Sequence, residues 1–382
     1  MGVKCNAPSL LMRPRRDTKA LAALLLCALF LASAAGQQPP REPRQFLNKV
    51  GFTHDQILQV EHGAVVVRIL KPGKHEVAAV AVARMHVPQE FFIARIRDIE
   101  RHKKSEAVLQ VRKFSDPAKP EDLAGLTLLS QEVQDLRTCQ PRQCRFKLSA
   151  HQMELIHSQL DFSAPTIEEN ANAAMRSLLA NYAREYEANG NRAMIVYADK
   201  DRAVESATQF AELIHRSSNV LAYAPEFRDY LLDFPNATLE GVERFLYWSR
   251  ENYGHNLQPV LAITDLVMYH RPDSNPPFLV ASKQIYATHY FEASLELTML
   301  FERNETDPSP SFYLVYVNRS RIDLLRKWYS VFARGSLSES ARNSIRKTVS
   351  ELRSKVEAEF KAAQDKPVNP RLPEERRQKD ND

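Results

Sequence analysis

The sequence predicts an α+β protein in which a curled antiparallel sheet packs against a long C-terminal helix, with a large helical insert. Four strand-like segments follow one another at 260–270, 278–290, 293–302 and 311–319. In the third, apolar and polar residues alternate, which is the period of a strand with one buried face. The helix that follows carries one apolar stripe, formed by Ile345, Val349, Leu352, Val356 and Phe360.

The first 35 residues read as a secretory signal peptide. Five basic residues precede or flank an apolar run of about a dozen residues, too short to span a bilayer, and small residues follow it. Cleavage would remove four of the five net positive charges of the chain. The remaining chain is therefore nearly neutral and lacks the basic stripe expected of a nucleic-acid-binding protein. We expect a periplasmic or secreted protein that does not bind nucleic acid.

Two cysteines remain after the signal peptide, Cys139 and Cys144, separated by a four-residue turn. In an oxidising compartment this spacing predicts a local disulfide. Two alternatives stay open, a redox-active pair and half of a metal site. The first normally has two intervening residues, and the second lacks further cysteines.

The elements before the insert follow from local signals. A Pro- and Gln-rich linker at 36–45 precedes the folded part, and Thr53 with Gln56 forms a capping box for a first helix. A hairpin is expected over 64–70 and 76–87, followed by a short helix that Pro88 opens and a strand over 107–114.

Between residues 116 and 256 the period of the apolar residues is 3.6 residues, as in a helix, in place of the two residues typical of a strand. The whole insert is therefore expected to be helical. Neither strand group is large enough to form a stable covered sheet by itself. We therefore expect one composite domain over 46–363 in which both groups join one sheet. The charged segment 364–382 is expected to be disordered.

The run at 83–114, ARMHVPQEFFIARIRDIERHKKSEAVLQVRKF, resembles the START and polyketide-cyclase group, also called the Bet v 1-like or helix-grip fold. Its features are a strand, Pro88, a glutamate two residues later, a short helix with Asp98 and another strand. The last strand and terminal helix match as well, since that helix closes a ligand cavity in the family. The resemblance covers 60–115 and 258–362. Segments 281–290 and 312–323 also resemble exported bacterial proteins of no assigned activity.

Five residues are candidates for lining such a cavity. Polar side chains interrupt otherwise apolar strand rows, and a buried charge must find a partner. Such groups could orient a mostly apolar ligand. The alternative is that they are rim or sheet-surface residues with local partners. The candidates are Asp265, Lys283, Tyr286, His289 and Tyr316.

Other chemistry has little support in the sequence. His151, Glu154 and His157 share a predicted helix, but their spacing does not fit a zinc-protease motif, and we expect no metal site. No phosphate-binding glycine motif occurs, so no nucleotide cofactor is expected. The aromatic stretch 245–248 and the pair at 328–329 could form an entrance lip that touches a membrane, or could pack in the core.

The expected function is therefore an exported binding or carrier protein for a hydrophobic small molecule or lipid, without a cofactor. Two other classes stay open. One is an enzyme on the same scaffold, a cyclase, lyase or hydrolase in which His289, Tyr286 or Asp265 acts as general acid or base. The other is a structural envelope protein with a filled core.

Overall fold

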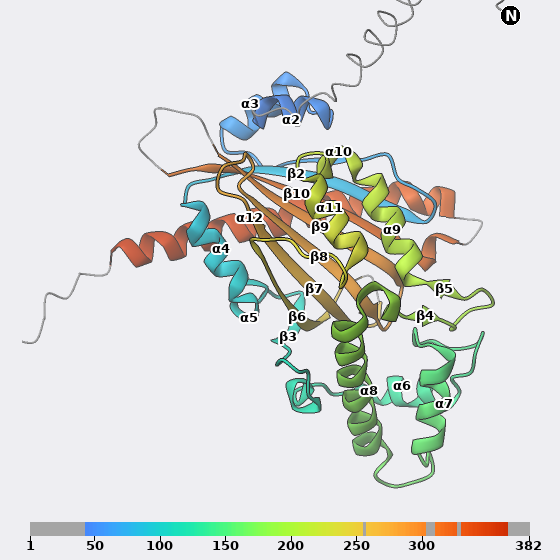
Figure 1. Cartoon of the computed structure of the whole chain (residues 1–382). Helices are drawn as coiled ribbons and strands as arrows, with labels where there is room; N and C mark the ends of the chain where they lie inside the picture. Colours follow the sequence, from blue (N-terminus) through green and yellow to red (C-terminus); the bar gives the residue numbers. More distant parts are fainter. Residues whose placement is uncertain (1–42, 255–256, 303–309, 327–329, 366–382) are drawn as a thin grey trace, which may run out of the picture. The chain divides into compact units, whose positions relative to one another are not determined.

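The structure, a computed structural model, describes residues 43–254, 257–302, 310–326 and 330–365. It confirms an α+β protein with a large antiparallel sheet. Eight strands form this sheet in the order β1-β2-β10-β9-β8-β7-β6-β3 (Figure 1). Their bounds are β1 Val66–Ile69, β2 Glu76–Met85, β3 Val108–Lys113, β6 Val242–Glu251, β7 Val260–His270, β8 Phe278–Ala287, β9 Phe291–Glu302 and β10 Phe312–Ile322.

Strands that are far apart in the sequence pair within this sheet. β2 pairs with β10 along its whole length, with Val82 opposite Val315, and β3 pairs with β6. The segment from β6 to β10 is a meander in which each strand pairs with the next. The N-terminal strands therefore lie on both sides of the meander, β1 and β2 on one and β3 on the other.

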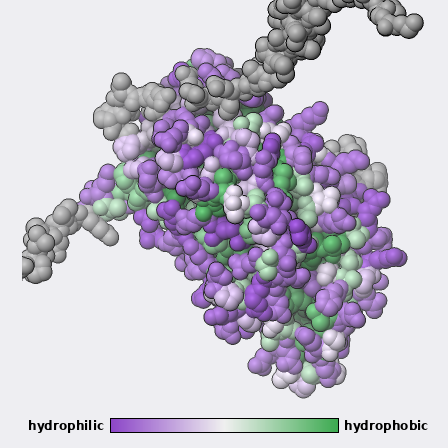
Figure 2. Space-filling view, viewed as in Figure 1, coloured by the Kyte–Doolittle hydropathy of each residue, from purple (hydrophilic) through white to green (hydrophobic). Residues whose placement is uncertain are grey.

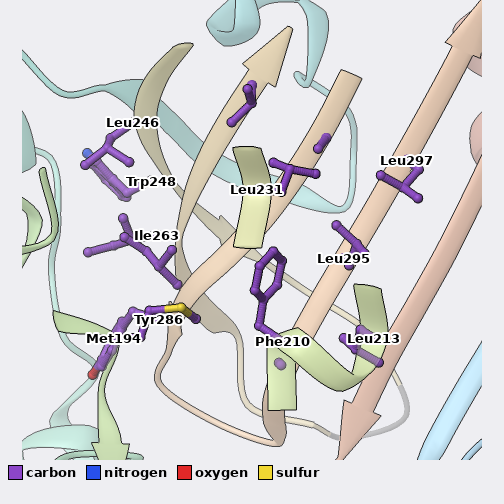
Figure 3. Packing of buried hydrophobic residues seen from close by; sticks show 14 of the residues in the cluster. Met194, Phe210, Leu213, Leu231, Leu246, Trp248, Ile263, Tyr286, Leu295 and Leu297 are labelled. Atoms are coloured by element: carbon purple, nitrogen blue, oxygen red, sulfur yellow. The ribbon is translucent and has the colours of Figure 1, made fainter. Parts of the chain in front are cut away.

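One face of the sheet, here called the insert face, is covered by helices between β3 and β6 and by the two N-terminal helices. Figure 1 shows α9, α10 and α11 in front of the strands. The close view in Figure 3 shows Phe210, Leu213 and Leu231 of these helices among strand residues such as Ile263, Leu295 and Leu297. The helices are α2 Pro43–Lys49, α3 His54–Glu61, α6 Ser130–Arg137, α7 Ala150–Gln159, α8 Ile167–Asn189, α9 Ser206–Arg216, α10 Ser218–Leu221 and α11 Pro225–Asp233.

The opposite face, here called the α12 face, packs against α4 Gln89–Arg97, α5 Ile99–His102 and α12 Ser330–Gln364. The predicted apolar stripe of α12 does point inward, since Val349 and Val356 are fully buried in this second core. α12 packs mainly against β1 and β2, which lie at one side of the sheet. Each face of the sheet thus has its own apolar core.

Several local signals in the sequence mark real boundaries. α3 begins after Thr53 with the expected capping box, and α7 begins after Ser149 in the same way. The disulfide between Cys139 and Cys144 is present as predicted. The backbone N–H of Cys144 donates to Asp199, so this turn lies against the segment that joins the short strands β4 Val196–Tyr197 and β5 Val204–Glu205.

The end of the insert differs from the expected helix, since residues 242–251 form strand β6. The reason is that both faces of β6 are covered. Leu246 and Trp248 belong to the core of the insert face, whereas Phe245 and Tyr247 contact the core of the α12 face. A strand that is apolar on both faces shows neither alternation nor a helical stripe. Burial of Tyr247 and Trp248 also excludes them from a membrane-facing lip.

Some predictions fall on residues that the structure does not describe. These are the signal peptide at 1–35, most of the linker, the aromatic pair at 328–329 and the tail beyond residue 365. Within the described segments, no helix is both long and apolar enough to cross a membrane. Hydrophilic residues make up most of the face of the molecule seen in Figure 2, with smaller hydrophobic areas between them.

Candidate functional site

The five residues predicted to line one cavity lie on two different faces of the sheet. Asp265, Lys283, Tyr286 and His289 are buried on the insert side, whereas Tyr316 contacts the core of the α12 face. Asp265 and Lys283 are direct cross-strand partners, so they share a face. The pairing of β7 with β8 shifts by one residue between Gln284 and Tyr286. This bulge places Tyr286 on the same side as Lys283, one position out of phase with simple alternation.

Asp265 and Lys283 belong to a buried polar network with the insert. Arg244 donates to one oxygen of Asp265 at 3.1 Å, and the Tyr186 hydroxyl donates to the other at 2.7 Å. Lys283 Nζ in turn donates to Tyr186 Oη at 3.0 Å and to the side-chain oxygen of Asn191. Both strand residues therefore have a partner on α8, and Lys283 has a second one on the 3₁₀ helix Gly190–Ala193 that follows it.

Burial lowers the pKa of Lys283 to about 7, because desolvation outweighs the attraction of Asp265, and Arg244 acts in the same direction as burial. An amine with such a pKa could act as a nucleophile. However, only 1% of Lys283 is exposed, and its ammonium lies 4.3 Å from the ring centre of Phe210. No substrate can reach it in this conformation, so Lys283 joins the insert to the sheet.

His289 and Tyr286 are enclosed in the same way. His289 Nδ1 is 3.1 Å from the carbonyl oxygen of Arg145, and Nε2 is 3.8 Å from Glu132, which binds Arg250 at 2.8 Å. Tyr286 is fully buried. Desolvation raises its pKa far above the usual value, so it stays protonated and offers no phenolate base at ordinary pH. In this conformation no substrate can therefore reach these residues for the general acid–base roles considered above.

The three residues weighed as a metal site do not converge. His157 Nε2 is 2.8 Å from the carbonyl oxygen of Cys139, so this imidazole binds the disulfide turn. His151 and Glu154 point into solvent on the exposed side of α7. Within the described ranges, no three His, Cys, Asp or Glu side chains form a group that could hold a metal ion.

The α12 face changes from apolar to polar along its strands. Its apolar half is filled by side chains. Phe312 is fully buried and packs edge-on to Phe92 of α4 at 5.6 Å, and Phe91 meets Phe360 of α12 at 5.0 Å. Leu300 and Leu314 are buried beside them. This half is a closed core that leaves no room for a ligand among its described side chains.

Farther along the same strands, the α12 face is polar and only half-buried. Ser282, Glu296 and Asn318 lie side by side across β8, β9 and β10, since Glu296 is the register partner of both others. Central strands with helices on both faces are normally buried, so half-buried positions here mean that the described part of the helix layer covers them only in part. We call these residues the polar floor: Ser282, Gln284, Glu296, Thr298, Tyr316 and Asn318.

An ion pair borders the polar floor. Lys103 Nζ is 3.0 Å from Glu251, and the two side chains are 23% and 18% exposed. Burial would lower the pKa of Lys103, but Glu251 together with Tyr247, Glu296 and Tyr253 more than reverses this and raises it well above its usual value. Ser249 and Tyr253 also donate to Glu251, at 2.7 and 3.3 Å. Both ions therefore stay charged and engaged with each other near neutral pH.

Within the floor, neutral groups surround Glu296. Asn318 donates to Glu296 at 3.3 Å, and Ser320 donates to the side-chain oxygen of Asn318 at 3.1 Å. Burial raises the pKa of the Tyr316 phenol well above its usual value, and the charge and hydrogen bond of Glu296 raise it further. The phenol of Tyr316 therefore remains protonated and donates to Glu296.

Sequence reasoning found only Tyr316 of this floor. The signal was present, because Ser294, Glu296 and Thr298 alternate with apolar residues on β9. We interpreted that row as solvent-facing, which is the usual meaning of alternation. Because helices pack over both faces of this sheet, a polar row on a central strand can also mark a polar region on a face that a helix layer partly covers.

Comparison with known proteins identifies no family for this chain. No protein-family model matches it, and neither curated proteins nor solved structures give a significant match. A functional interpretation therefore rests on the chain's own geometry and chemistry.

Proposed function

We propose that the chain is an exported binding or carrier protein that holds a small amphipathic molecule or lipid against the polar floor. The observation that carries the proposal is the half-buried polar row across three central strands beside a long helix. Ligand sites typically combine recessed apolar surface with a few polar groups that fix orientation. The half-buried ring of Tyr316 offers apolar surface, and the rest of the floor offers the polar groups.

The resemblance to the START-like group supports the same face. The segments that carry it appear as β2, α4, β3, β10 and α12, in the expected order. In that group the terminal helix closes the cavity, and α12 packs on the side of the sheet that bears the polar floor. The disulfide is in keeping with export, because disulfides persist in oxidising compartments.

The test is whether this face holds a molecule. Protein isolated from the cell envelope of its own host is examined by native mass spectrometry for a bound small molecule. Binding of the neutral fluorescent probe N-phenyl-1-naphthylamine is measured on the purified chain. We expect a copurifying compound, and probe binding that this compound displaces.

A matched pair of variants locates the site. Thr298→Trp adds a large ring to the polar floor, whereas Thr208→Trp adds the same ring at an exposed position of α9. Only the first should reduce probe binding. If the wild-type protein carries no molecule and binds no probe, the proposal is overturned. A structural envelope protein with a filled core then remains. A compound that the protein converts with a bell-shaped pH response would favour the enzyme class instead.

A further inference from the structure

We propose that the polar floor selects ligands with a cationic ammonium head, and that Glu296 is the residue that recognises it. This inference rests on the proposed function and names its ligand class. Glu296 is half-buried at the centre of the floor. Its hydrogen-bond donors are neutral, the amide of Asn318 and the phenol of Tyr316. Among the described side chains, no Lys, Arg or His forms an ion pair with it.

The neighbouring charges leave a net negative site. Lys103 is held by Glu251 at 3.0 Å, so one ammonium faces two carboxylates when Glu296 is included. Glu296 raises the pKa of the Tyr316 phenol and Lys103 lowers it, so both charges act on the floor. An added cation would restore neutrality in a setting where water screens charges poorly.

Aromatic rings supply the second element of cation recognition. Tyr316 is half-buried on this face, and the exposed Tyr253 packs against Phe291 near its edge with ring centres 5.2 Å apart. The ammonium of Lys103 already lies 5.8 Å from the ring centre of Tyr247, within the range of a cation–π contact. A carboxylate beside tyrosine rings is a suitable environment for a quaternary or protonated amine.

An anionic head fits less well. To bind it, Lys103 would have to turn away from Glu251 and leave that carboxylate partly buried without its cation. Removing one partner of a buried ion pair is strongly unfavourable. A neutral head would use the hydroxyl and amide groups of the floor but would gain nothing from the charge of Glu296. The ligand class favoured by the charges is therefore an organic cation with an apolar body.

The experiment compares three probes of similar chain length and different head charge. Decanoylcholine, 1-decanol and sodium decyl sulfate each compete with N-phenyl-1-naphthylamine for the purified full chain, below their micelle concentrations. We expect decanoylcholine to bind about tenfold more tightly than 1-decanol, the equivalent of roughly 1.4 kcal/mol, and decyl sulfate to bind most weakly.

The variant Glu296→Gln keeps the size and a hydrogen-bonding side chain while removing the charge. It should lose the preference for decanoylcholine and keep its affinity for 1-decanol within about twofold. The control Glu90→Gln, at an exposed position of α4, should keep the preference. Thermal unfolding by circular dichroism verifies that both variants are folded.

The outcomes separate this inference from the proposed function. Equal affinity for all three probes, or an unchanged preference in Glu296→Gln, would overturn the cation inference and leave the binding function standing. Failure of the wild-type chain to bind N-phenyl-1-naphthylamine or any of the three probes would overturn both.

Discussion

The ammonium of Lys283 on β8 lies 3.0 Å from the hydroxyl oxygen of Tyr186 on α8. A central strand and the longest helix of the insert thus share a polar contact inside an otherwise apolar core. The hydroxyl of Tyr186 also donates a hydrogen bond to Asp265 at 2.7 Å, so this phenol joins both strand residues to the insert. The insert is fixed on the sheet by specific polar contacts as well as by apolar packing.

The buried amine should make stability depend on pH. Burial lowers the pKa of Lys283 to about 7, whereas an unfolded lysine titrates near 10.5. Between these values only the unfolded chain holds the proton, so the free energy of unfolding rises with pH across this window. From pH 7 to pH 9, wild type should gain about 2 kcal/mol relative to Lys283→Met in urea unfolding.

The control for this experiment is Lys347→Met, at an exposed position of α12. It should follow the wild-type pH dependence. An equal pH dependence in wild type and Lys283→Met would mean that Lys283 keeps an ordinary pKa in the folded protein.

A second prediction concerns the ion pair between α6 and β6. Glu132 and Arg250 are both nearly buried, with a distance of 2.8 Å between Arg250 Nη2 and Glu132 Oε2. Glu132→Ala leaves the guanidinium without its carboxylate and should reduce the free energy of unfolding by about 3 kcal/mol. The double variant Glu132→Met/Arg250→Met should recover part of this loss. A loss below 0.5 kcal/mol (about the experimental error) in the single variant would contradict the buried pair.

The disulfide should contribute modestly to the free energy of unfolding. Because Cys139 and Cys144 are only five residues apart, closing the turn removes little entropy from the unfolded chain, and its loss should cost about 2 kcal/mol. Cys139→Ser/Cys144→Ser should also increase amide hydrogen exchange at Cys144, whose N–H donates to Asp199. Unchanged exchange there would show that the turn keeps its shape without the bond.

The contribution of the apolar stripe of α12 to stability can be tested by shortening one of its buried side chains. Val356 is 1% exposed in the core of the α12 face, and Val356→Ala should lower the free energy of unfolding by about 2 kcal/mol. Glu351→Ala, at an exposed position of the same helix, should change it by less than about 0.5 kcal/mol. Similar losses in both variants would indicate that helix propensity, and not burial, determines the result.

The meander and the terminal helix could be predicted from the sequence because their patterns survive in the fold. Met299 and Leu297 face one core while Thr298 and Glu296 face the other side, as alternation requires. The helix stripe at Val349 and Val356 survives for the same reason. Each of these elements has one face that differs clearly from the other.

Two features could not be predicted because they depend on what covers the sheet. β6 has apolar side chains on both faces, so its sequence carries no period that distinguishes it from a helix. The faces of Asp265 and Tyr316 depend on strand register and on the bulge beside Tyr286, which local patterns do not encode. The insert buries one set of polar residues, and the incomplete α12 layer leaves the other set accessible.

The strand order has a consequence for how this chain becomes structured. β2 is translated long before its partner β10, and β3 long before β6, with the whole insert between them. Until residues 312–322 are available, the inner edge of β2 has unpaired N–H and C=O groups that could bind another chain. A nascent molecule would therefore be vulnerable to aggregation through β2, and a chaperone that shields residues 76–85 would protect it.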